Sequence, residues 1–378
     1  MNHKLDFVNS SLKKIRDQNL YRTLQYGSIE GPHIVFNRKK LINLCSNDYL
    51  GLHMNRISNK QLQSSSRLVA GNDSLFKSLE EKLARHKSQE SSLVFPTGYM
   101  ANLGSIATLA QKGDVILSDE LNHASIIESC RLSEAKITIY KHNDATDLEK
   151  KIKQKANRKF VVTEGVFSMD GDLANLKEIS HIATKNDAIF ALDDAHGDFV
   201  AGSDGKGTGQ HFGVEKKIDL YVSSLSKGLG AFGGYVASKN EVIEFLINKS
   251  KSFIYTSALP SFLVDLALKR FTSNREKQRK KLWKNIHLMS SGLKSLGYEI
   301  NSSSQIIPII IGNEKTALDF GKYLFEKGVF AQPIRYPTVK MNTARVRISI
   351  TAWLTKNHIE RSLAVLEQAG RKFRIFQR

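Results

Sequence analysis

A single lysine, Lys227, lies in a run of small residues with the sequence SLSKGLGAFGGY. It follows the apolar stretch DLYVSS, which predicts a buried β-strand over residues 219–224. A lysine on an exposed loop needs no small neighbours, whereas a lysine whose amine is approached closely by another molecule does. The side-chain amine at this position is a candidate for covalent catalysis through a Schiff base.

A carboxylate and an imidazole follow a second apolar run. Asp193 comes directly after AIFAL, so we expect its side chain to be partly buried. A buried carboxylate needs a cationic partner, and the sequence therefore predicts that Asp193 faces one. His196 lies three residues further on.

Polar residues also follow three other predicted strands. Gly98 and Tyr99 lie between the predicted strand SSLVF and a predicted helix, where backbone N–H groups suit a phosphate. His123 comes after the strand DVILS. Glu164 is the last residue of the strand KFVVTE, and Ser168 follows that strand. Because ligands of open α/β sheets lie beyond the carboxyl ends of the strands, we expect these side chains to gather. Together with Lys227 and Asp193 they are the groups that pyridoxal 5′-phosphate requires, since the lysine forms the Schiff base and the carboxylate keeps the pyridine nitrogen protonated.

The elements that must position these residues alternate along the chain. Between residues 75 and 240, short apolar strands alternate with amphipathic helices, which indicates an α/β fold with a mostly parallel sheet covered on both faces. After residue 277 the pattern changes to a smaller α+β unit, and an amphipathic helix is predicted near the N-terminus. We therefore predict an N-terminal helix and arm over residues 1–42, a large domain over residues 43–276 and a small domain over residues 277–378.

Composition narrows the class of protein. The chain has 378 residues, of which 41% are hydrophobic and 25% charged, and this balance is typical of soluble globular proteins. No apolar run approaches the length of a membrane span, the N-terminus has no secretory signal pattern, and the two cysteines lie in no metal-binding pattern. We expect a cytoplasmic protein with no metal ion and no membrane association. The net charge of +19 attracts polyanions, but no nucleic-acid-binding motif is present, so we expect no nucleic acid as the main ligand.

The segment GLGAFG matches the dinucleotide-binding pattern GxGxxG at Gly228, Gly230 and Gly233. That pattern requires a helix to follow, whereas GGYVAS predicts a strand. The glycines after Lys227 equally let a flat ring approach the backbone, and we favour this interpretation.

The whole set of motifs resembles one family, the α-oxoamine synthases of fold-type I pyridoxal-phosphate enzymes. The resemblance runs through LCSNDYLGL, PTGYMANL, DELNHASII, TEGVFSMDGD, LDDAHGDFVAG, SLSKGLGAFGGY, FIYTSALP and YPTVKMNTARVRISITA. It implies a large domain with a mostly parallel seven-stranded sheet, a smaller C-terminal α+β domain, pyridoxal 5′-phosphate as the cofactor, and a homodimer with shared active sites.

The resemblance also implies a role for each matching residue. Around the cofactor ring, Lys227 is the Schiff-base lysine and acid/base, Asp193 pairs with the pyridine nitrogen, His196 bonds the phenolic oxygen, His123 stacks on the ring, and Ser168 lies beside the cofactor. At its phosphate, the resemblance implies contacts from Gly98, Tyr99 and Ser224, with Thr256 and Ser257 supplied by the second subunit. Substrate contacts are implied for Arg347, which holds the amino-acid carboxylate, and for Asn47, Arg22, Thr351 and His123.

Members of this family differ in substrate. The chain most resembles those that condense L-alanine with pimeloyl-CoA or a pimeloyl-acyl carrier protein to give 8-amino-7-oxononanoate, carbon dioxide and a free thiol in biotin biosynthesis. Where many members have glycines, this chain has Ser64, Ser65 and Ser66, close to the implied acyl-chain site. A sister enzyme that uses glycine or serine, a catalytically silent partner subunit, and a nucleic-acid-binding protein are the alternatives.

Overall fold

The computed structural model describes residues 6–22, 27–52 and 65–376, and Ser64 lies outside them. These residues form two compact units. The larger unit consists of Asn47–Ser168 and Asp172–Lys280. The smaller unit combines the described part of Met1–Ser46 with Met169–Gly171 and Lys281–Arg378. The N-terminal arm thus belongs with the C-terminal part of the chain, although the division into domains at residues 42 and 276 stays a prediction.

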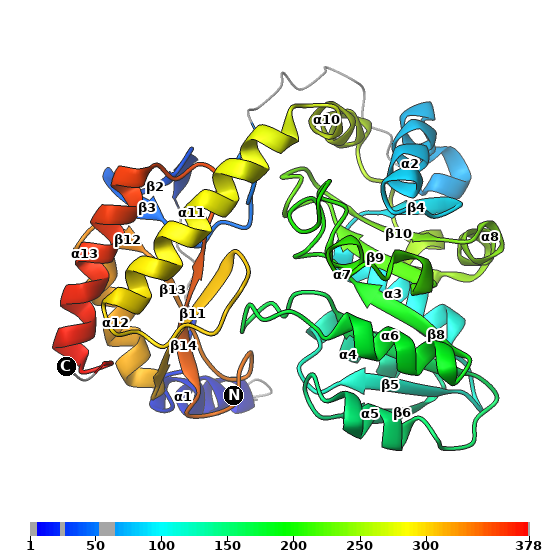
Figure 1. The fold of residues 1–378 in the computed structure, drawn as a ribbon, viewed down its shortest axis with the longest axis horizontal. Coiled ribbons are helices and arrows are strands. Elements are labelled where there is room, and N and C mark those ends of the chain that lie inside the picture. Colours follow the sequence, from blue (N-terminus) through cyan, green and yellow to red (C-terminus); the bar gives the residue numbers. More distant parts are fainter. Residues whose placement is uncertain (1–5, 23–26, 53–64, 377–378) are drawn as a thin grey trace. The chain divides into compact units, whose positions relative to one another are not determined.

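The larger unit is built on a sheet of seven described strands (Figure 1). Their order across the sheet is β4-β10-β9-β8-β7-β5-β6. Strand β10 is antiparallel to both of its neighbours, and the remaining pairs are parallel. The strands are β4 (Ser91–Phe95), β5 (Val115–Asp119), β6 (Lys136–Tyr140), β7 (Lys159–Glu164), β8 (Ala188–Asp193), β9 (Leu220–Ser224) and β10 (Gly234–Ser238).

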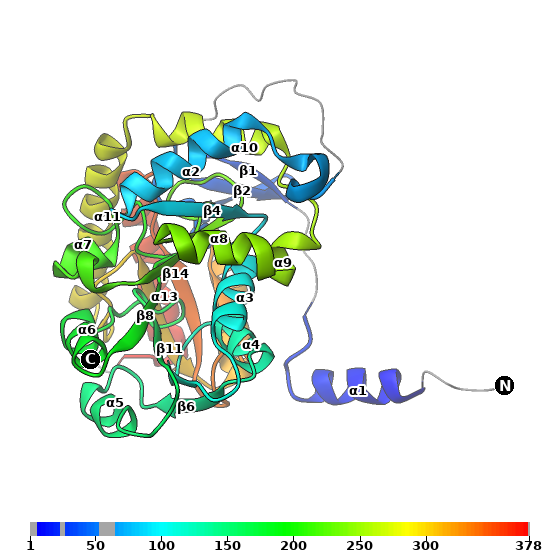
Figure 2. The ribbon, with the colours of Figure 1, turned by 90° about the vertical axis from the view of Figure 1, so that its right-hand side faces the viewer.

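Helices cover the sheet on its two faces. One face carries α3, α4, α8 and α9, and α3 and α4 lie side by side (Figure 2). The helices of this unit are α2 (Ser74–His86), α3 (Gly98–Leu109), α4 (Ala124–Leu132), α5 (Ala145–Lys151), α6 (Leu176–Lys185), α7 (Thr208–Phe212), α8 (Asn240–Lys249), α9 (Lys251–Ile254) and α10 (Ser261–Phe271), with a π-helical turn at Arg67–Gly71 and a 3-10 turn at Glu215–Lys217. The chain passes into the smaller unit within α11 (Arg275–Ser295).

The central strands are buried on both faces, and their sequences are therefore continuous apolar runs. Every residue of β5, β9 and β10 is buried, because helices cover both faces of a parallel sheet. Residues such as Phe160, Val162 and Val222 pack against Ile106 of α3 and Ile126 of α4 in one cluster. This core fixes where each strand ends, and therefore where the polar residues after it lie.

The smaller unit contains two sheets and its own helices. One sheet has the order β1-β2-β3-β12, and the other is antiparallel with the order β11-β14-β13. Its elements are α1 (Asp6–Asp17), β1 (Ser28–Glu30), β2 (His33–Phe36), β3 (Lys39–Asn43), β11 (Ile306–Gly312), α12 (Glu314–Glu326), β12 (Val329–Phe330), β13 (Gln332–Ile334), β14 (Ala344–Ser349) and α13 (Lys356–Phe373).

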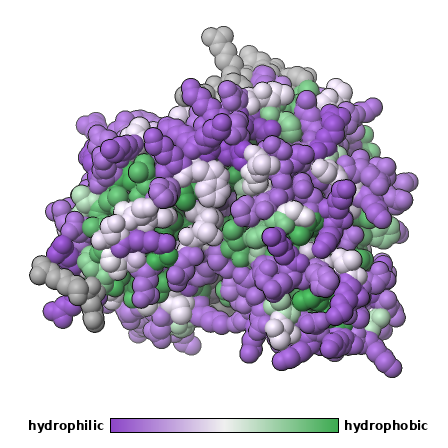
Figure 3. Space-filling model, in the orientation of Figure 1, coloured by the Kyte–Doolittle hydropathy of each residue, from purple (hydrophilic) through white to green (hydrophobic). Residues whose placement is uncertain are grey.

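The predicted architecture is confirmed: a mostly parallel sheet of seven strands, followed by a smaller α+β unit and preceded by an amphipathic helix. Hydrophilic residues predominate on the face drawn in Figure 3. Among the described helices, none is long and apolar enough to cross a membrane. The described residues also contain no group of three or more His, Cys, Asp or Glu side chains arranged to hold a metal ion.

Candidate active site

A pocket of about 220 Å³ lies at the carboxyl ends of the central strands of the larger unit. Seven residues singled out from the sequence line it, and they come from the ends of β5, β7, β8 and β9 and the start of α3. They are Gly98, Tyr99, His123, Glu164, Asp193, Ser224 and Lys227. The sequence interpretation missed other lining residues, among them Asn102, Ser125, Ala195 and Ser226.

Lys227 and His196 are in direct contact. The Lys227 Nζ atom lies 2.9 Å from His196 Nε2. The other ring nitrogen, Nδ1, lies 2.7 Å from the hydroxyl of Tyr49, and Tyr49 is 3.1 Å from the side-chain oxygen of Asn47. The lysine amine is therefore held at one end of a hydrogen-bonded chain that reaches Asn47.

Asp193 lies at the end of β8 with both carboxylate oxygens engaged. The backbone N–H of Ala195 donates to Oδ1 at 2.9 Å, and the amide of Asn102 donates to Oδ2 at 2.6 Å. Asp193 is 8% exposed, as its position after AIFAL predicts. The carboxylate is thus fixed in orientation toward the pocket that it lines.

His123 caps the start of α4. Its Nδ1 atom accepts from the backbone N–H of Ser125 at 3.2 Å and lies 2.8 Å from the Ser125 hydroxyl. Burial lowers the pKa of His123, and the Lys227 charge also lowers it, while Asp193 acts in the opposite direction. The imidazole is therefore neutral at neutral pH, and its ring meets that of Tyr99 edge-on at 6.5 Å between centroids.

Glu164 adds a second carboxyl group to the same pocket. It ends β7 and lies opposite Asp193 in the strand register, so the two side chains leave the sheet on the same face. Burial raises the pKa of Glu164 well above its ordinary value, and the nearby charge of Asp193 raises it further. Its Oε1 atom is buried without a hydrogen-bond partner among the described protein atoms. Although the Lys227 charge and the His123 backbone act in the opposite direction, the raised pKa favours the protonated form of Glu164.

The start of α3 forms the other end of the pocket. Thr97 caps the helix through its side chain, which accepts from Met100 N–H at 3.1 Å. The Ser224 hydroxyl lies beside the first turn, 2.8 Å from the Ser226 hydroxyl. A Cβ on Gly234 would overlap the backbone of Gly98, so only glycine lets β10 pass the start of the helix here. Backbone N–H groups and two hydroxyls at a helix N-terminus form a site for an anion.

Ser168 is buried but is not among the lining residues. Its loop is fixed by His142, whose ring nitrogens lie 2.9 Å from Asp119 and 3.0 Å from Asp172. The ring also meets Phe167 edge-on at 4.4 Å. Burial alone would lower the pKa of His142, but the hydrogen bonds to the two carboxylates raise it to about 10. This imidazolium clamps the loop between β7 and α6.

A buried ion cluster supports the loop after β8. Lys87 is fully buried and lies 2.9 Å from Asp194 and 2.8 Å from Asp198. His86 and Tyr235 also bond to Asp198, at 2.9 and 2.6 Å. Although burial alone would lower it, the two carboxylates raise the pKa of Lys87. The loop that carries Asp193 and His196 is thereby fixed from behind.

The glycines after Lys227 lie where the loop packs closely against the rest of its unit. None of them lines the pocket. A Cβ on Gly228 would overlap the carbonyl oxygen of Asp198, and one on Gly230 would overlap the carboxylate of Asp48. They allow the loop to pack against its own unit, and the approach of a ring to their backbone stays a prediction. As predicted, the strand β10 follows them, which excludes the dinucleotide interpretation.

The remaining predicted residues lie elsewhere in the structure. Thr256 and Ser257 follow α9 and are not among the lining residues; the Thr256 hydroxyl lies 4.0 Å from the sulfur of Met100. The implied substrate contacts Arg22, Arg347 and Thr351 belong to the smaller unit. There the Arg347 guanidinium donates to Ser349 Oγ at 2.8 Å and is 9% exposed, and that of Arg22 donates to the Tyr336 carbonyl at 3.1 Å.

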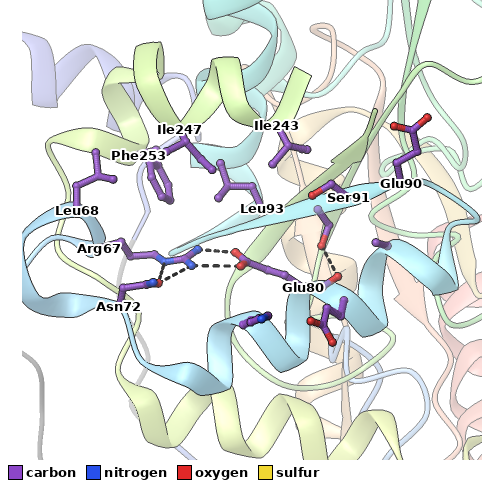
Figure 4. Close-up of a pocket in the computed structure, with 14 residues that line it drawn as sticks. Arg67, Leu68, Asn72, Glu80, Glu90, Ser91, Leu93, Ile243, Ile247 and Phe253 are labelled. Carbon is purple, nitrogen blue, oxygen red and sulfur yellow. Dashed lines mark hydrogen bonds and ion pairs between the residues drawn. The ribbon is translucent and has the colours of Figure 1, made fainter. Parts of the chain in front are cut away.

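A second pocket of the larger unit, of about 440 Å³, has a structural explanation (Figure 4). The Arg67 guanidinium bonds to both carboxylate oxygens of Glu80 and to Asn72, and the Glu80 carboxylate also accepts from Val94 N–H. The charged groups that Figure 4 joins are thus paired with one another. The ion pair joins the turn Arg67–Gly71 to α2, and the hydrogen bond from Val94 N–H joins α2 to β4.

The residues of the first pocket fit pyridoxal phosphate. A lysine amine, a carboxylate with fixed orientation and an imidazole converge on a space large enough for one ring, and the helix start and two serine hydroxyls offer a phosphate site at one end. The unpartnered Glu164 oxygen shows that this lining is built for a polar ligand.

Comparisons with known proteins agree with this fit. The family model for aminotransferase class I and II matches residues 39–366. The curated 8-amino-7-oxononanoate synthase of Thermoanaerobacter pseudethanolicus is 42% identical, over 99% of this chain and 99% of the relative. That of Thermosipho melanesiensis is 40% identical over 96% of each chain. Among solved structures, a serine palmitoyltransferase from S. paucimobilis with a bound adduct of pyridoxal phosphate and myriocin superposes with a TM-score of 0.92, at 28% identity and 99% coverage of both chains.

Proposed function

Because the chain belongs to the aminotransferase class I and II family and, within it, to the α-oxoamine synthases, we propose that it makes 8-amino-7-oxononanoate. The substrates are L-alanine and a pimeloyl thioester of CoA or of an acyl carrier protein. The products are 8-amino-7-oxononanoate, carbon dioxide and the free thiol, so the enzyme is an acyltransferase of biotin biosynthesis that acts in the cytoplasm. The observation that carries this proposal is the 42% identity to a curated enzyme of this activity along the whole chain.

Pyridoxal phosphate supplies the electron sink that stabilises a carbanion at the amino acid's α-carbon. Lys227 would hold the cofactor through its amine and would move the α-proton of the amino acid. Asp193 would pair with the pyridine nitrogen, and His196, which contacts the Lys227 amine, would bond the phenolic oxygen. His123 would stack on the ring, and Ser168 would lie beside the cofactor.

The start of α3, with Gly98 and Tyr99 in its first turn, and Ser224 would hold the phosphate. In a homodimer, Thr256 and Ser257 would contact the phosphate bound by the other subunit, and their position outside the pocket of their own chain supports this assignment. Each active site is then complete only in the dimer.

Arg347 holds the amino-acid carboxylate, because a guanidinium binds a carboxylate with two parallel hydrogen bonds. Asn47, Arg22 and Thr351 contribute the other substrate contacts. The segment of Ser64, Ser65 and Ser66 would lie near the acyl chain of the substrate in this proposal. Many family members have glycines there.

A serine-dependent activity is the second candidate, because the serine palmitoyltransferase fold superposes with a TM-score of 0.92. Its sequence identity of 28% is lower than the 42% of the alanine-dependent relative. The identity therefore favours the alanine-dependent reaction.

The decisive measurement is thiol release from pimeloyl-CoA by the holoenzyme, with alanine, glycine or serine as the second substrate. An absorbance spectrum of the purified protein is recorded first, to establish that pyridoxal phosphate is bound. We expect thiol release and 8-amino-7-oxononanoate with alanine alone. Turnover with serine or glycine and not with alanine would move the protein to a sister activity, and a protein that takes up no pyridoxal phosphate would contradict the cofactor assignment.

A further inference from the structure

Asn102 on α3 and Ser125 on α4 connect the side chains of His123 and Asp193, which lie far apart in the sequence. The amide nitrogen of Asn102 lies 2.6 Å from Asp193 Oδ2 and 2.9 Å from Ser125 Oγ. Ser125 Oγ in turn lies 2.8 Å from His123 Nδ1. All four side chains line the same pocket, and Asn102 and Ser125 are each 2% exposed. The result is a continuous hydrogen-bonded chain from His123 to Asp193.

The direction of each hydrogen bond in this chain follows from the chemistry of its members. A carboxylate only accepts, so the Asn102 amide must turn its NH₂ group, and not its oxygen, toward Asp193. The second hydrogen of the same NH₂ group then points at Ser125 Oγ, which accepts it. The Ser125 hydroxyl hydrogen is left free to donate to His123 Nδ1.

The hydrogen bonds to His123 determine which of its ring nitrogens carries the proton. The backbone N–H of Ser125 also points at His123 Nδ1, at 3.2 Å, because His123 caps α4. A backbone N–H cannot reverse its role, and together with the shorter hydrogen bond from the Ser125 hydroxyl it holds Nδ1 as the acceptor, so the ring proton lies on Nε2. Burial keeps the imidazole neutral, and His123 therefore offers one N–H donor.

We propose that Asn102 and Ser125 are positioning residues that lock His123 in the Nε2–H tautomer and hold the Asp193 carboxylate in one orientation. Neither residue touches the reacting atoms, and each acts through a neighbour. Asn102 holds both ends at once, because its two amide hydrogens serve Asp193 and Ser125. The importance of this network for cofactor binding rests on the proposed function, whereas the tautomer is a property of the protein alone.

The tautomer is tested by NMR of protein labelled with ¹⁵N-histidine and prepared without cofactor. We expect the ring nitrogens of His123 to show the Nε2–H form in the wild-type protein. In Ser125→Ala the hydroxyl donor at 2.8 Å is lost, and only the backbone N–H at 3.2 Å still donates to Nδ1. Because this remaining hydrogen bond is the longer one, we expect a measurable fraction of the Nδ1–H form. A wild-type protein with the proton on Nδ1 would overturn the proposal, whether or not the proposed reaction is found.

The effect on Asp193 is tested by titrating the cofactor-free protein with pyridoxal phosphate. We expect Asn102→Leu, which keeps the side-chain volume but removes both hydrogen bonds, to weaken binding by about tenfold or more. Ser105→Ala is the matched control, because Ser105 lies on the same helix and its buried hydroxyl bonds only to backbone carbonyls. If Asn102→Leu does not fold, Ser125→Ala alone decides through the tautomer. Wild-type affinity in Asn102→Leu, or a wild-type tautomer in Ser125→Ala, would overturn the corresponding half of the proposal.

Discussion

Asp193 is held from two sides, by the Ala195 backbone and by the Asn102 amide. A carboxylate fixed in this way needs no reorganisation when a cationic ring nitrogen faces it, and such preorganised electrostatics are the largest contribution in many enzymes. The Asp193 side chain is therefore expected to contribute more to the rate than to the fold.

Replacing this carboxylate tests that expectation. We expect Asp193→Ala to lower the turnover rate by at least ~10³-fold, by analogy with the loss of other preorganised groups. The measurement is thiol release at saturating pyridoxal phosphate, with Asp204→Ala, on an exposed loop, as the control. Turnover near the wild-type level would contradict the role of Asp193.

The raised pKa of His142 leads to a prediction about how the stability of the protein depends on pH. Its pKa is raised to about 10 in the folded protein by Asp119 and Asp172, from an ordinary value near 6.5. A raised folded-state pKa means that this stabilisation is complete below about pH 6.5 and is lost as the pH rises through about 10. The clamp on the Ser168 loop is thus in place at neutral pH.

The variant His142→Gln keeps a hydrogen-bonding side chain but removes the charge. We expect it to unfold at a lower denaturant concentration than the wild-type protein at pH 7, with a difference that shrinks above pH 10. Denaturation curves at both pH values measure this, and His181→Gln, at an exposed position, is the control. A difference between His142→Gln and wild type that stays constant with pH would contradict the assigned charge.

At the scale of elements, the loop after β8 depends on residues far away in sequence. The end of α2 supplies Lys87, which lies between Asp194 and Asp198, and β10 supplies Tyr235. These contacts fix the backbone on both sides of His196. The same packing explains the small residues after Lys227, since a side chain at Gly228 would collide with this loop.

Removing the central cation tests the cluster. We expect Lys87→Met to destabilise the protein by about 3–5 kcal/mol, because two buried carboxylates then lose their partner. Urea unfolding measures the change, and Lys185→Met, whose ion pair with Glu149 is exposed, is the control and is expected to change stability little. A stability close to the wild-type value in Lys87→Met would show that the carboxylates are neutralised in another way.

At the scale of the whole molecule, the proposed homodimer explains why Thr256 and Ser257 lie outside the pocket of their own chain. Tyr255, immediately before them, is 82% exposed in the single chain, although it is a large aromatic residue. Because aromatic residues are enriched at protein interfaces, Tyr255 is suited to contact the other subunit of the proposed homodimer.

Shared sites predict complementation between two inactive variants. We expect Lys227→Ala to have no activity and the double variant Thr256→Ala/Ser257→Ala to bind the cofactor weakly. Mixing the two after subunit exchange creates dimers with one intact site, so activity returns in part. A mixture that stays as inactive as its components, although mass spectrometry shows mixed dimers, would contradict the sharing of phosphate contacts.

Much of this protein follows from its sequence alone. The seven strands of the large sheet were predictable because each is a short apolar run, and helices cover both of its faces. The positions of Lys227, Asp193 and His123 after those runs were sufficient to predict that they meet, because parallel strands end at one edge of a sheet.

The tertiary structure alone decided which neighbours these residues have. Asn102 lies inside a helix, and no local pattern distinguishes it from an ordinary core position, whereas the end of a strand marks Glu164 but does not reveal that its neighbour is Asp193. Their contacts with Asp193 come from the packing of α3 and from the register of β7 against β8. Hydrogen bonds between side chains 91 residues apart depend on the distance between elements in space, and sequence periodicity, which reports only which face is buried, does not contain that distance.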